Sequence, residues 1–143
     1  MQYSTIIFLY LFSLVINAQE IKGKWITIDD DTGKEKSVVE IYEKENGKIY
    51  GKIVEFLEEG AQPEDPCEHC KGSMKGNKLI GFEVLKDFEK KGDQYENGKV
   101  TDPEEDKTYD SKIWVDKENP DILKVRGYVS IMYRTQEWKR KKD

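Results

Sequence analysis

The chain has 143 residues, of which 36% are hydrophobic and 37% are charged, with a net charge of −5 and a single His. This length fits about one domain of ordinary size. The acidic balance excludes a nucleic-acid binder that depends on a basic, phosphate-binding surface. The single His excludes sites built on several imidazoles, such as a three-His zinc site. We therefore expect no nucleic-acid partner and no cofactor.

The first 18 residues contain no Asp, Glu, Lys or Arg, and residues 6–16 (IIFLYLFSLVI) are almost continuously apolar. A membrane-spanning helix needs about 20 such residues, whereas a signal peptide has a shorter apolar segment followed by a small residue. We expect residues 1–18 to be a signal peptide cleaved after Ala18, and residues 19–143 to be the mature domain. The alternative is an uncleaved N-terminal anchor. Cleavage would leave an exported chain, in the periplasm or secreted, with no membrane span.

The mature chain is a series of short runs rich in β-branched and aromatic residues, with turn-forming residues between them. Asn46-Gly47 separates two of these runs and predicts a hairpin, because a type I′ turn needs positive φ at both positions. Asn97-Gly98 is expected inside or just beyond a turn. The predicted strands, in chain order, are residues 21–28, 37–42, 48–57, 79–88, 94–101, 108–115, 122–128 and 131–138.

About eight short strands and no amphipathic helical stripe predict an all-β fold. Within the sixth and seventh runs apolar and polar residues alternate, as in strands with one buried and one solvated face. Closing such strands into an antiparallel up-and-down β-barrel removes exposed sheet edges. We expect one small barrel with one long irregular loop, residues 58–77, which contains both cysteines.

Cys67-Glu68-His69-Cys70 allows several chemistries. A c-type haem site is excluded, because Lys71 stands where that motif needs a His. We expect a disulfide between Cys67 and Cys70, since an exported chain meets an oxidising environment and the spacing fits a bridged turn. A zinc site and a redox-active pair are the alternatives.

No residue set predicts catalysis, and we expect no catalytic residues. The only His lies inside the cysteine loop, so a Ser or Cys triad lacks a well-placed base. Asp29-Asp30-Asp31 does not fit an EF-hand, because Gly33 falls at the fifth rather than the sixth position of the loop. These aspartates are expected to form a hairpin turn.

The two ends of the mature chain are expected to meet, because the first and last strands of a closed barrel are neighbours. Trp25 in the first strand and Arg134 in the last predict a barrel-closing contact, with the guanidinium against the indole face. The alternative is an ordinary core Trp with a surface Arg.

Several short motifs resemble, in family order, the exported bacterial family known as domain of unknown function 2147. The Asp-Pro, Val-Arg-Gly and Arg-Thr-x-x-Trp segments are moderately specific. The resemblance implies an exported domain of lipocalin-like (calycin) shape, and it brings no established activity or catalytic residues. The cysteine loop is similar to that of the family branch found in Bacteroidetes-type Gram-negative bacteria. The motifs are Gly23-x-Trp25, NGKIYGKI (46–53), Cys67-x-x-Cys70-Lys71-Gly72, Leu79-x-Gly81, Gly98-Lys99-Val100-x-Asp102-Pro103, Lys107-Thr108-Tyr109, Leu123-Lys124-Val125-Arg126-Gly127 and Arg134-Thr135-Gln136-x-Trp138.

From these observations we expect a non-enzymatic barrel that binds a small ligand in its mouth or interior. The first alternative is a structural or interaction module of the cell envelope that docks through exposed aromatic residues and the cysteine loop. The second is an enzyme acting on envelope carbohydrate or on thiols. The residues expected to line the ligand site are Tyr50, Phe56, Phe82, Tyr109, Trp114 and Tyr128.

Overall fold

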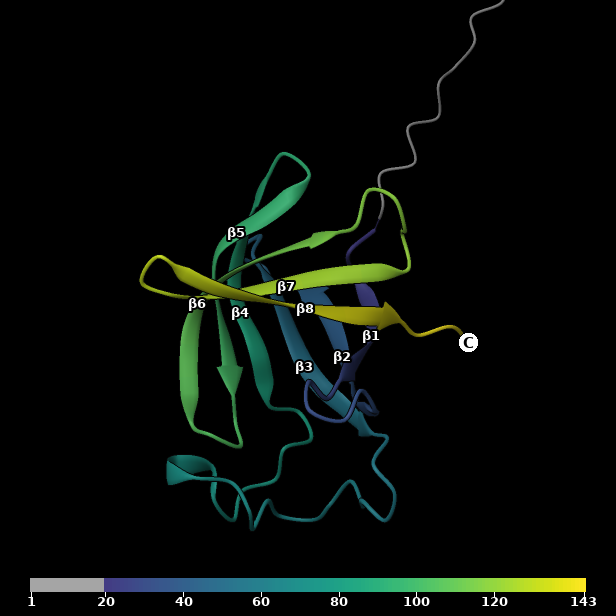
Figure 1. The fold of residues 1–143 in the computed structure, drawn as a ribbon, viewed down its shortest axis with the longest axis vertical. Coiled ribbons are helices and arrows are strands. Elements are labelled where there is room, and N and C mark those ends of the chain that lie inside the picture. Colours follow the sequence, from purple (N-terminus) through teal and green to yellow (C-terminus); the bar gives the residue numbers. More distant parts are fainter. Residues whose placement is uncertain (1–19) are drawn as a thin grey trace, which may run out of the picture.

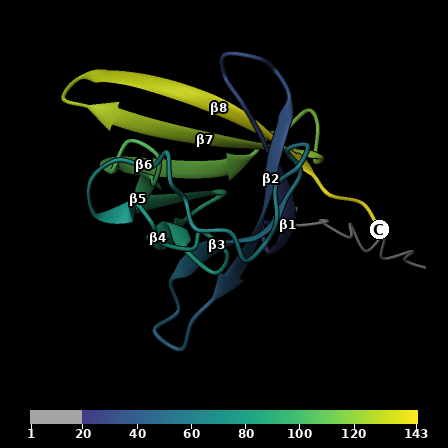
Figure 2. The same ribbon diagram turned by 90° about the horizontal axis from the view of Figure 1, so that it is seen from below.

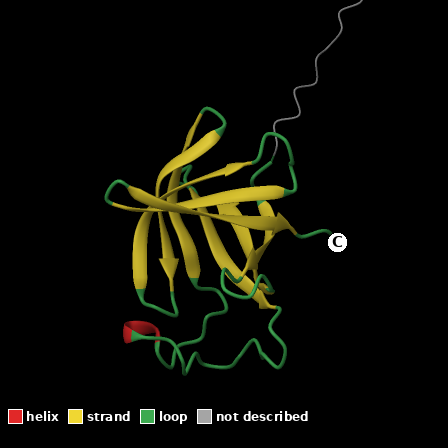
Figure 3. Cartoon of the chain, viewed as in Figure 1, coloured by secondary structure: helices red, strands yellow, loops and turns green. Residues whose placement is uncertain are grey.

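The computed structural model describes residues 20–143, so the predicted signal peptide lies outside the described residues. Apart from one short 3₁₀ helix, η1 (Gly72–Met74), the regular structure consists of strands (Figure 3). Among residues 20–143, no helix is long and apolar enough to cross a membrane. The eight strands are β1 (Gly23–Ile28), β2 (Glu35–Glu43), β3 (Ile49–Phe56), β4 (Glu83–Lys91), β5 (Gln94–Asp102), β6 (Lys107–Val115), β7 (Ile122–Val129) and β8 (Met132–Arg140).

The strands form one closed barrel in the order β1 to β8, and each strand pairs antiparallel with the next (Figure 1). β1 and β8 close the barrel through the pairs Trp25–Arg140 and Ile26–Lys139. The prediction of an all-β, up-and-down barrel of about eight strands is confirmed.

Alternation along the strands places one set of side chains inside the barrel. In β6, Ser111, Ile113 and Val115 are buried, whereas the residues between them are at least partly exposed. In β7, Leu123 and Val125 are buried in the same way. These apolar side chains join one core cluster that runs around the barrel interior. Because side chains in a strand alternate with period two, this pattern fixes which residues can face a ligand in the interior.

The predicted hairpin at Asn46-Gly47 is present, but its turn is not type I′, because Gly47 has a positive φ and Asn46 does not. It connects β2 to β3, and Gly47 has φ +79°, a conformation that glycine adopts without steric cost. The Gly47 N–H donates to the carbonyl of Lys44 at 2.9 Å. The Asn46 side chain accepts from the Lys48 N–H at 2.9 Å, so the turn is held by its own polar groups.

The boundary predicted for the fourth strand is wrong at its start. Residues 79–82 are not part of β4, which begins at Glu83. The Phe82 N–H donates to the carbonyl of Leu79 at 3.0 Å, and Gly81 between them has φ +85°. This turn bends the chain before the strand begins. Leu79 is nevertheless buried and packs on the core from the loop, which is why its apolar character suggested a strand.

Asn97-Gly98 lies within β5 rather than at a turn. The pairing of β5 with β6 shifts register between Tyr95 and Gly98, and Asn97 has φ +59°, so this pair forms a bulge. A Cβ added at Gly98 would lie 2.4 Å from the Phe88 ring. Glycine is required here because the ring of Phe88, which is fully buried, packs directly against its backbone.

One end of the barrel is closed around Trp25, which is completely buried. Its indole N–H donates to the carbonyl of Ile21 at 2.8 Å. The guanidinium of Arg140 lies 4.2 Å from the Trp25 ring, and it donates to the carbonyls of Glu20 and Pro120 at 3.0 Å each. Arg140 therefore joins the last strand to the N-terminal segment and to the β6–β7 turn.

The predicted contact between Trp25 and Arg134 is therefore wrong in its choice of arginine. Trp25 pairs with Arg140 in the antiparallel register of β1 and β8. Arg134 lies six residues earlier in β8, which corresponds to roughly 20 Å along the strand. This distance places it at the opposite end of the barrel, where its side chain is exposed and faces Asp30.

Candidate functional site

A cavity of about 1010 Å³ occupies the end of the barrel opposite Trp25. Its walls come from the ends of the strands that meet the β1–β2, β3–β4, β5–β6 and β7–β8 connections. The long β3–β4 loop, residues 57–82, runs across this end of the barrel (Figures 1 and 2). We refer to this end as the mouth.

The inner part of the cavity is apolar. Its lining residues there belong to the core cluster and come from five different strands. Trp138 is the largest of them and is only 4% exposed. An apolar group that entered the barrel would therefore be removed from water against these side chains. The apolar residues that line this inner part are Val39, Ile53, Val84, Val125 and Trp138.

A chain of hydrogen bonds leads from this apolar floor to the mouth. The indole N–H of Trp138 donates to Oε1 of Gln136 at 3.2 Å, and Nε2 of Gln136 donates to Oδ2 of Asp30 at 2.7 Å. The same Asp30 oxygen lies 3.8 Å from Nε of Arg134. All four side chains line the cavity, so polar groups of defined orientation extend along one wall.

A second polar cluster lies where β1 meets β2. The hydroxyls of Thr27 and Ser37 are 2.7 Å apart, and the Ser37 N–H donates to the Thr27 hydroxyl at 3.1 Å. Nearby, Nζ of Lys36 lies 2.5 Å from Oε1 of Glu104 in the β5–β6 turn. Burial opposes the charge of Lys36, but its hydrogen bond to Glu104 and the surrounding carboxylates outweigh burial and raise its pKa. Lys36 thus remains a cation bound to the mouth's own carboxylates.

Carboxylates dominate the charge of the cavity lining. Among residues 20–143, Lys36 and Arg134 are the only Lys or Arg side chains in that lining, and each lies beside one of the carboxylates. The mouth is therefore a region of negative potential above an apolar floor. The carboxylates are Asp29, Asp30, Asp31, Glu58, Asp65, Asp102, Glu104 and Glu105.

Asp29 organises the turn that carries three of these carboxylates. Its Oδ1 accepts from the N–H groups of Asp31 and Thr32 and from the Thr32 hydroxyl, at 2.8–3.0 Å. The Thr32 hydrogen bonds hold the pKa of Asp29 below its usual value. The aspartate run therefore forms a turn, as predicted, and the hydrogen bonds within that turn favour the ionised form of Asp29.

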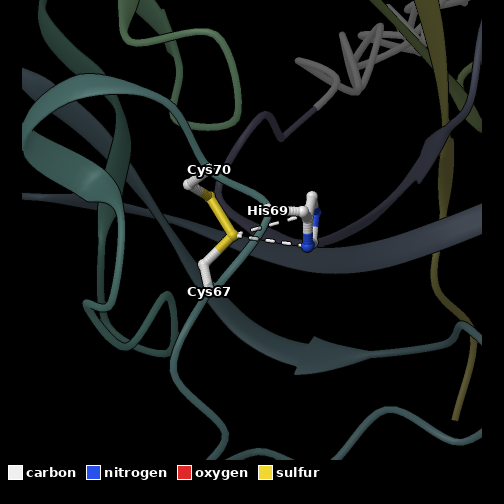
Figure 4. Close-up of side chains that lie close together, drawn as sticks. All are labelled: Cys67, His69 and Cys70. Atoms are coloured by element: carbon white, nitrogen blue, oxygen red, sulfur yellow. Dashed lines mark hydrogen bonds between the residues drawn. A yellow bond between two sulfur atoms is a disulfide. The ribbon is translucent and has the colours of Figure 1, made fainter.

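The cysteine loop covers part of the mouth. Cys67 and Cys70 form a disulfide, and both residues are buried and join the core cluster (Figure 4). Cys67 also lines the cavity. Both nitrogens of the His69 ring lie 3.7 Å from Sγ of Cys67. These three residues are close enough to share a metal only if the disulfide is first reduced, because zinc binds thiolates.

The same loop is fastened to the β5–β6 turn. The Lys71 N–H donates to the carbonyl of Glu104 at 2.7 Å, and its ammonium lies 2.8 Å from Glu105. Asp106 accepts from the N–H and the hydroxyl of Ser73. Gly72 lies so close to the Asp106 carboxylate that an added Cβ would be 2.2 Å from it. The loop is thus held across the mouth by backbone, side chains and disulfide together.

The predicted ligand-lining residues divide into three groups. Phe56 and Tyr109 line the cavity, whereas Phe82 packs against the core without reaching the lining. Tyr50, Trp114 and Tyr128 lie on the outer side of the barrel, because their neighbours in the strands face inward.

Their outer positions are visible in their contacts. Tyr50 stacks on Tyr42 with ring centroids 6.2 Å apart, and Trp114 lies under the guanidinium of Arg126 at 5.0 Å. The prediction from aromatic character alone therefore missed the polar wall, formed by Asp30, Gln136 and their neighbours. Strand alternation could have identified this wall, because residues 134, 136 and 138 share one face of the last strand.

The comparisons with known proteins agree with this geometry. Residues 23–140 match the family model described as "Uncharacterized protein conserved in bacteria (DUF2147)". The chain belongs to this family. No curated protein matches the sequence.

A solved structure is similar over most of the chain. It is "Protein HP1028 from the human pathogen Helicobacter pylori", whose description states that it belongs to the lipocalin family. The TM-score is 0.70 at 23% identity, and the match covers 87% of this chain and 84% of that one. At this identity the likeness shows the fold alone. The lipocalin-like barrel that the motifs implied is confirmed.

Proposed function

We propose that this protein binds a small amphipathic ligand, without chemical conversion, in the cavity at the barrel mouth. The observation that carries the proposal is the cavity itself, whose floor is apolar and whose wall presents a few oriented polar groups. Small-molecule sites are typically clefts of about 300–1,000 Å³ with this composition. A barrel of eight strands is just wide enough to hold one such ligand.

The distribution of charge favours one class of ligand. An apolar tail would pack against Val125 and Trp138, and its polar head would remain at the mouth. Because carboxylates outnumber cations in the lining, a cationic head is favoured over an anionic one. Lys36 does not reverse this preference, since Glu104 already neutralises it.

The disulfide supports a binding role over thiol chemistry. Redox-active cysteines are low-pKa thiols that are accessible to solvent. Cys67 and Cys70 are 5% and 2% exposed and are bonded to each other. A buried bridge that stabilises the covering loop fits a site that holds a ligand.

The same disulfide supports export, because such bonds persist in oxidising compartments. We propose that residues 1–18 are removed as the chain leaves the cytoplasm and that the barrel functions in the periplasm or outside the cell. N-terminal sequencing of the protein recovered from its native host would begin at Gln19. Recovery of intact residues 1–18 on a folded, disulfide-bonded chain would contradict cleavage.

Calorimetric titration with two ligands of equal chain length tests the binding proposal. Dodecyltrimethylammonium and dodecanoate, both below their micelle concentrations, share an alkyl chain and differ in the charge of the head. We expect one molecule of the cation to bind per barrel, at least about tenfold more tightly than the anion. The absence of binding by either amphiphile would overturn the proposal.

A variant that fills the cavity supplies the matched control. Gly127 lines the cavity, and a Cβ at this position would meet Tyr109 and Val100 at ordinary distances of 3.6 Å. Gly127→Leu should therefore fold and should block the cavity. Lys86→Leu adds the same side chain at an exposed position of β4 and should leave binding unchanged. Equal binding by both variants would place the ligand outside the barrel and contradict the proposal.

A further inference from the structure

The turn between β7 and β8 carries an unusual concentration of exposed apolar side chains. In the part of the chain that the structure describes, the large hydrophobic residues that are exposed all lie at this turn. They are Val129 at 61%, Ile131 at 92%, Met132 at 74% and Tyr133 at 60%. We call residues 129–133 the hairpin tip. In both ribbon views the tip projects beyond the rest of the barrel (Figures 1 and 2).

The charge around the tip differs from that of the whole chain. Residues 122–136 contain Lys124, Arg126 and Arg134 but no Asp or Glu, whereas the chain carries a net charge of −5. Lys124 is paired with Asp116 and Glu137, and Arg134 lies beside Asp30, whereas the guanidinium of Arg126 contacts aromatic rings and the hydroxyl of Thr135. An apolar tip backed by the Arg126 cation is complementary to a surface that is apolar inside and anionic outside.

On the outer face of the barrel, aromatic and cationic side chains follow one another along the hairpin away from the tip. The ring of Tyr133, the last residue of the tip, lies 6.0 Å from the ring of Tyr128. The guanidinium of Arg126 lies 4.1 Å from the Tyr133 ring and 5.0 Å from the Trp114 ring. Amphipathic rings and snorkelling cations are the side chains that favour the boundary between hydrocarbon and headgroups.

We propose that the hairpin tip inserts into the surface of a lipid bilayer that contains anionic headgroups. Ile131 and Met132 enter the acyl boundary, the two tyrosines lie at headgroup level, and Arg126 contacts lipid phosphates. This docking function belongs to the end of the β7–β8 hairpin. Because Val129, Met132 and Tyr133 also line the cavity, docking would place the mouth beside the bilayer.

The acidic mouth limits how the protein can approach. Asp30 lies beside Arg134 at the base of the hairpin, and the other mouth carboxylates would be repelled by anionic lipid. The barrel must therefore dock by its tip, with the remainder of the mouth held away from the headgroups.

Vesicle flotation of the mature protein tests this proposal. We expect flotation with vesicles of phosphatidylethanolamine and phosphatidylglycerol, and weaker flotation with pure phosphatidylcholine. Ile131→Ser/Met132→Ser should reduce the partition coefficient at least about tenfold, because two apolar side chains no longer leave water. Ile131→Trp should show a blue shift of tryptophan emission when anionic vesicles are added.

Two control variants show whether the tip itself binds the bilayer. Lys117→Ser/Glu118→Ser changes two exposed residues of the β6–β7 turn, at the other end of the barrel, and should leave flotation unchanged. Gly127→Leu should bind vesicles normally even if it binds no amphiphile, so failure of the cavity proposal would not mimic failure of docking. Absence of wild-type flotation, or equal flotation of the Ile131→Ser/Met132→Ser variant, would overturn the proposal. A dimer in light scattering that this variant abolishes would assign the tip to self-association instead.

Discussion

The two ends of the barrel are built on different principles. At the closed end the connections are short, Trp25 is fully buried, and Arg140 joins three segments through its stacking and hydrogen bonds. At the mouth a 26-residue loop, residues 57–82, is held by a disulfide and polar contacts around a cavity. The closed end therefore supplies stability, and the mouth, where packing is incomplete, contains the cavity proposed to hold a ligand.

Because the two ends differ in this way, replacing a large side chain by Ala should lower the free energy of unfolding more at the closed end than at the mouth. Trp25→Ala should lower the free energy of unfolding by about 3–5 kcal/mol, because it opens a large cavity in packed core. Tyr109→Ala at the mouth should cost about 1 kcal/mol or less, since this half-buried ring borders an existing cavity. Urea unfolding monitored by circular dichroism measures both. If Trp25→Ala does not fold, Trp25→Phe takes its place. A loss of unfolding free energy equal to that of Tyr109→Ala would contradict the difference between the two ends of the barrel.

The disulfide is a covalent constraint on the loop that covers the mouth. Cys67→Ser/Cys70→Ser should lower the free energy of unfolding by about 2 kcal/mol, the value expected from chain entropy for a bridge across three residues. Reduced wild type should show the same loss. Without reductant, iodoacetamide followed by mass spectrometry should find neither cysteine labelled. Labelling of native protein would instead favour the redox-active or metal-binding alternatives.

The two arginines of β8 allow a smaller and more specific comparison. Arg140→Gln removes the cation from the Trp25 ring and should cost about 1–2 kcal/mol, since the contact is largely desolvated. Arg134→Gln should change stability by no more than about 0.5 kcal/mol, because the Arg134 side chain is 76% exposed. Equal losses in thermal or urea unfolding would mean that Arg140 does not close the barrel.

Acidification should have the smallest effect, and part of that effect should arise at the mouth. The pKa of Asp29 is lowered in the folded protein, so its contribution to stability is present at neutral pH. This contribution is lost below about pH 4, as pH falls through the lowered pKa. Asp29→Asn should therefore flatten the acid limb of a plot of melting temperature against pH. An acid limb identical to that of wild type would show that the Thr32 hydrogen bonds do not act through Asp29.

Much of this architecture could be predicted from residue patterns. The Asn46-Gly47 turn, the alternation in β6 and β7, and the absence of helical periodicity each depend on local stereochemistry. The spacing of Cys67 and Cys70, together with the expected export, predicted their bridge but left a zinc site and a redox-active pair as alternatives. Local rules therefore recovered the strands, the barrel and the disulfide.

The errors came from relations between distant strands. Trp25 meets Arg140 rather than Arg134 because the register of β1 against β8 is set by the whole closed barrel. The Asn97-Gly98 bulge depends on Phe88, a residue of the neighbouring strand. The sequence around Trp25 does not identify Arg140 as its partner, and the sequence around Gly98 does not identify Phe88.

The lining of the candidate site was the hardest part to predict for the same reason. Aromatic character selected Trp114 and Tyr128, which the strand alternation places outside the barrel. The polar wall depends on Asp30 and Gln136, which are 106 residues apart in the chain. Only the folded barrel brings these two side chains together.

The central claim, that an apolar group enters the barrel through the mouth, can be tested by fluorescence quenching. An alkylammonium with bromine at the end of its tail should quench Trp138, which lies in the cavity floor. Trp25, at the closed end, and Trp114, on the outer face, serve as internal controls. We expect saturable quenching in wild type that is lost in Trp138→Phe. Quenching that persists unchanged in Trp138→Phe, or none at saturating ligand, would contradict this claim.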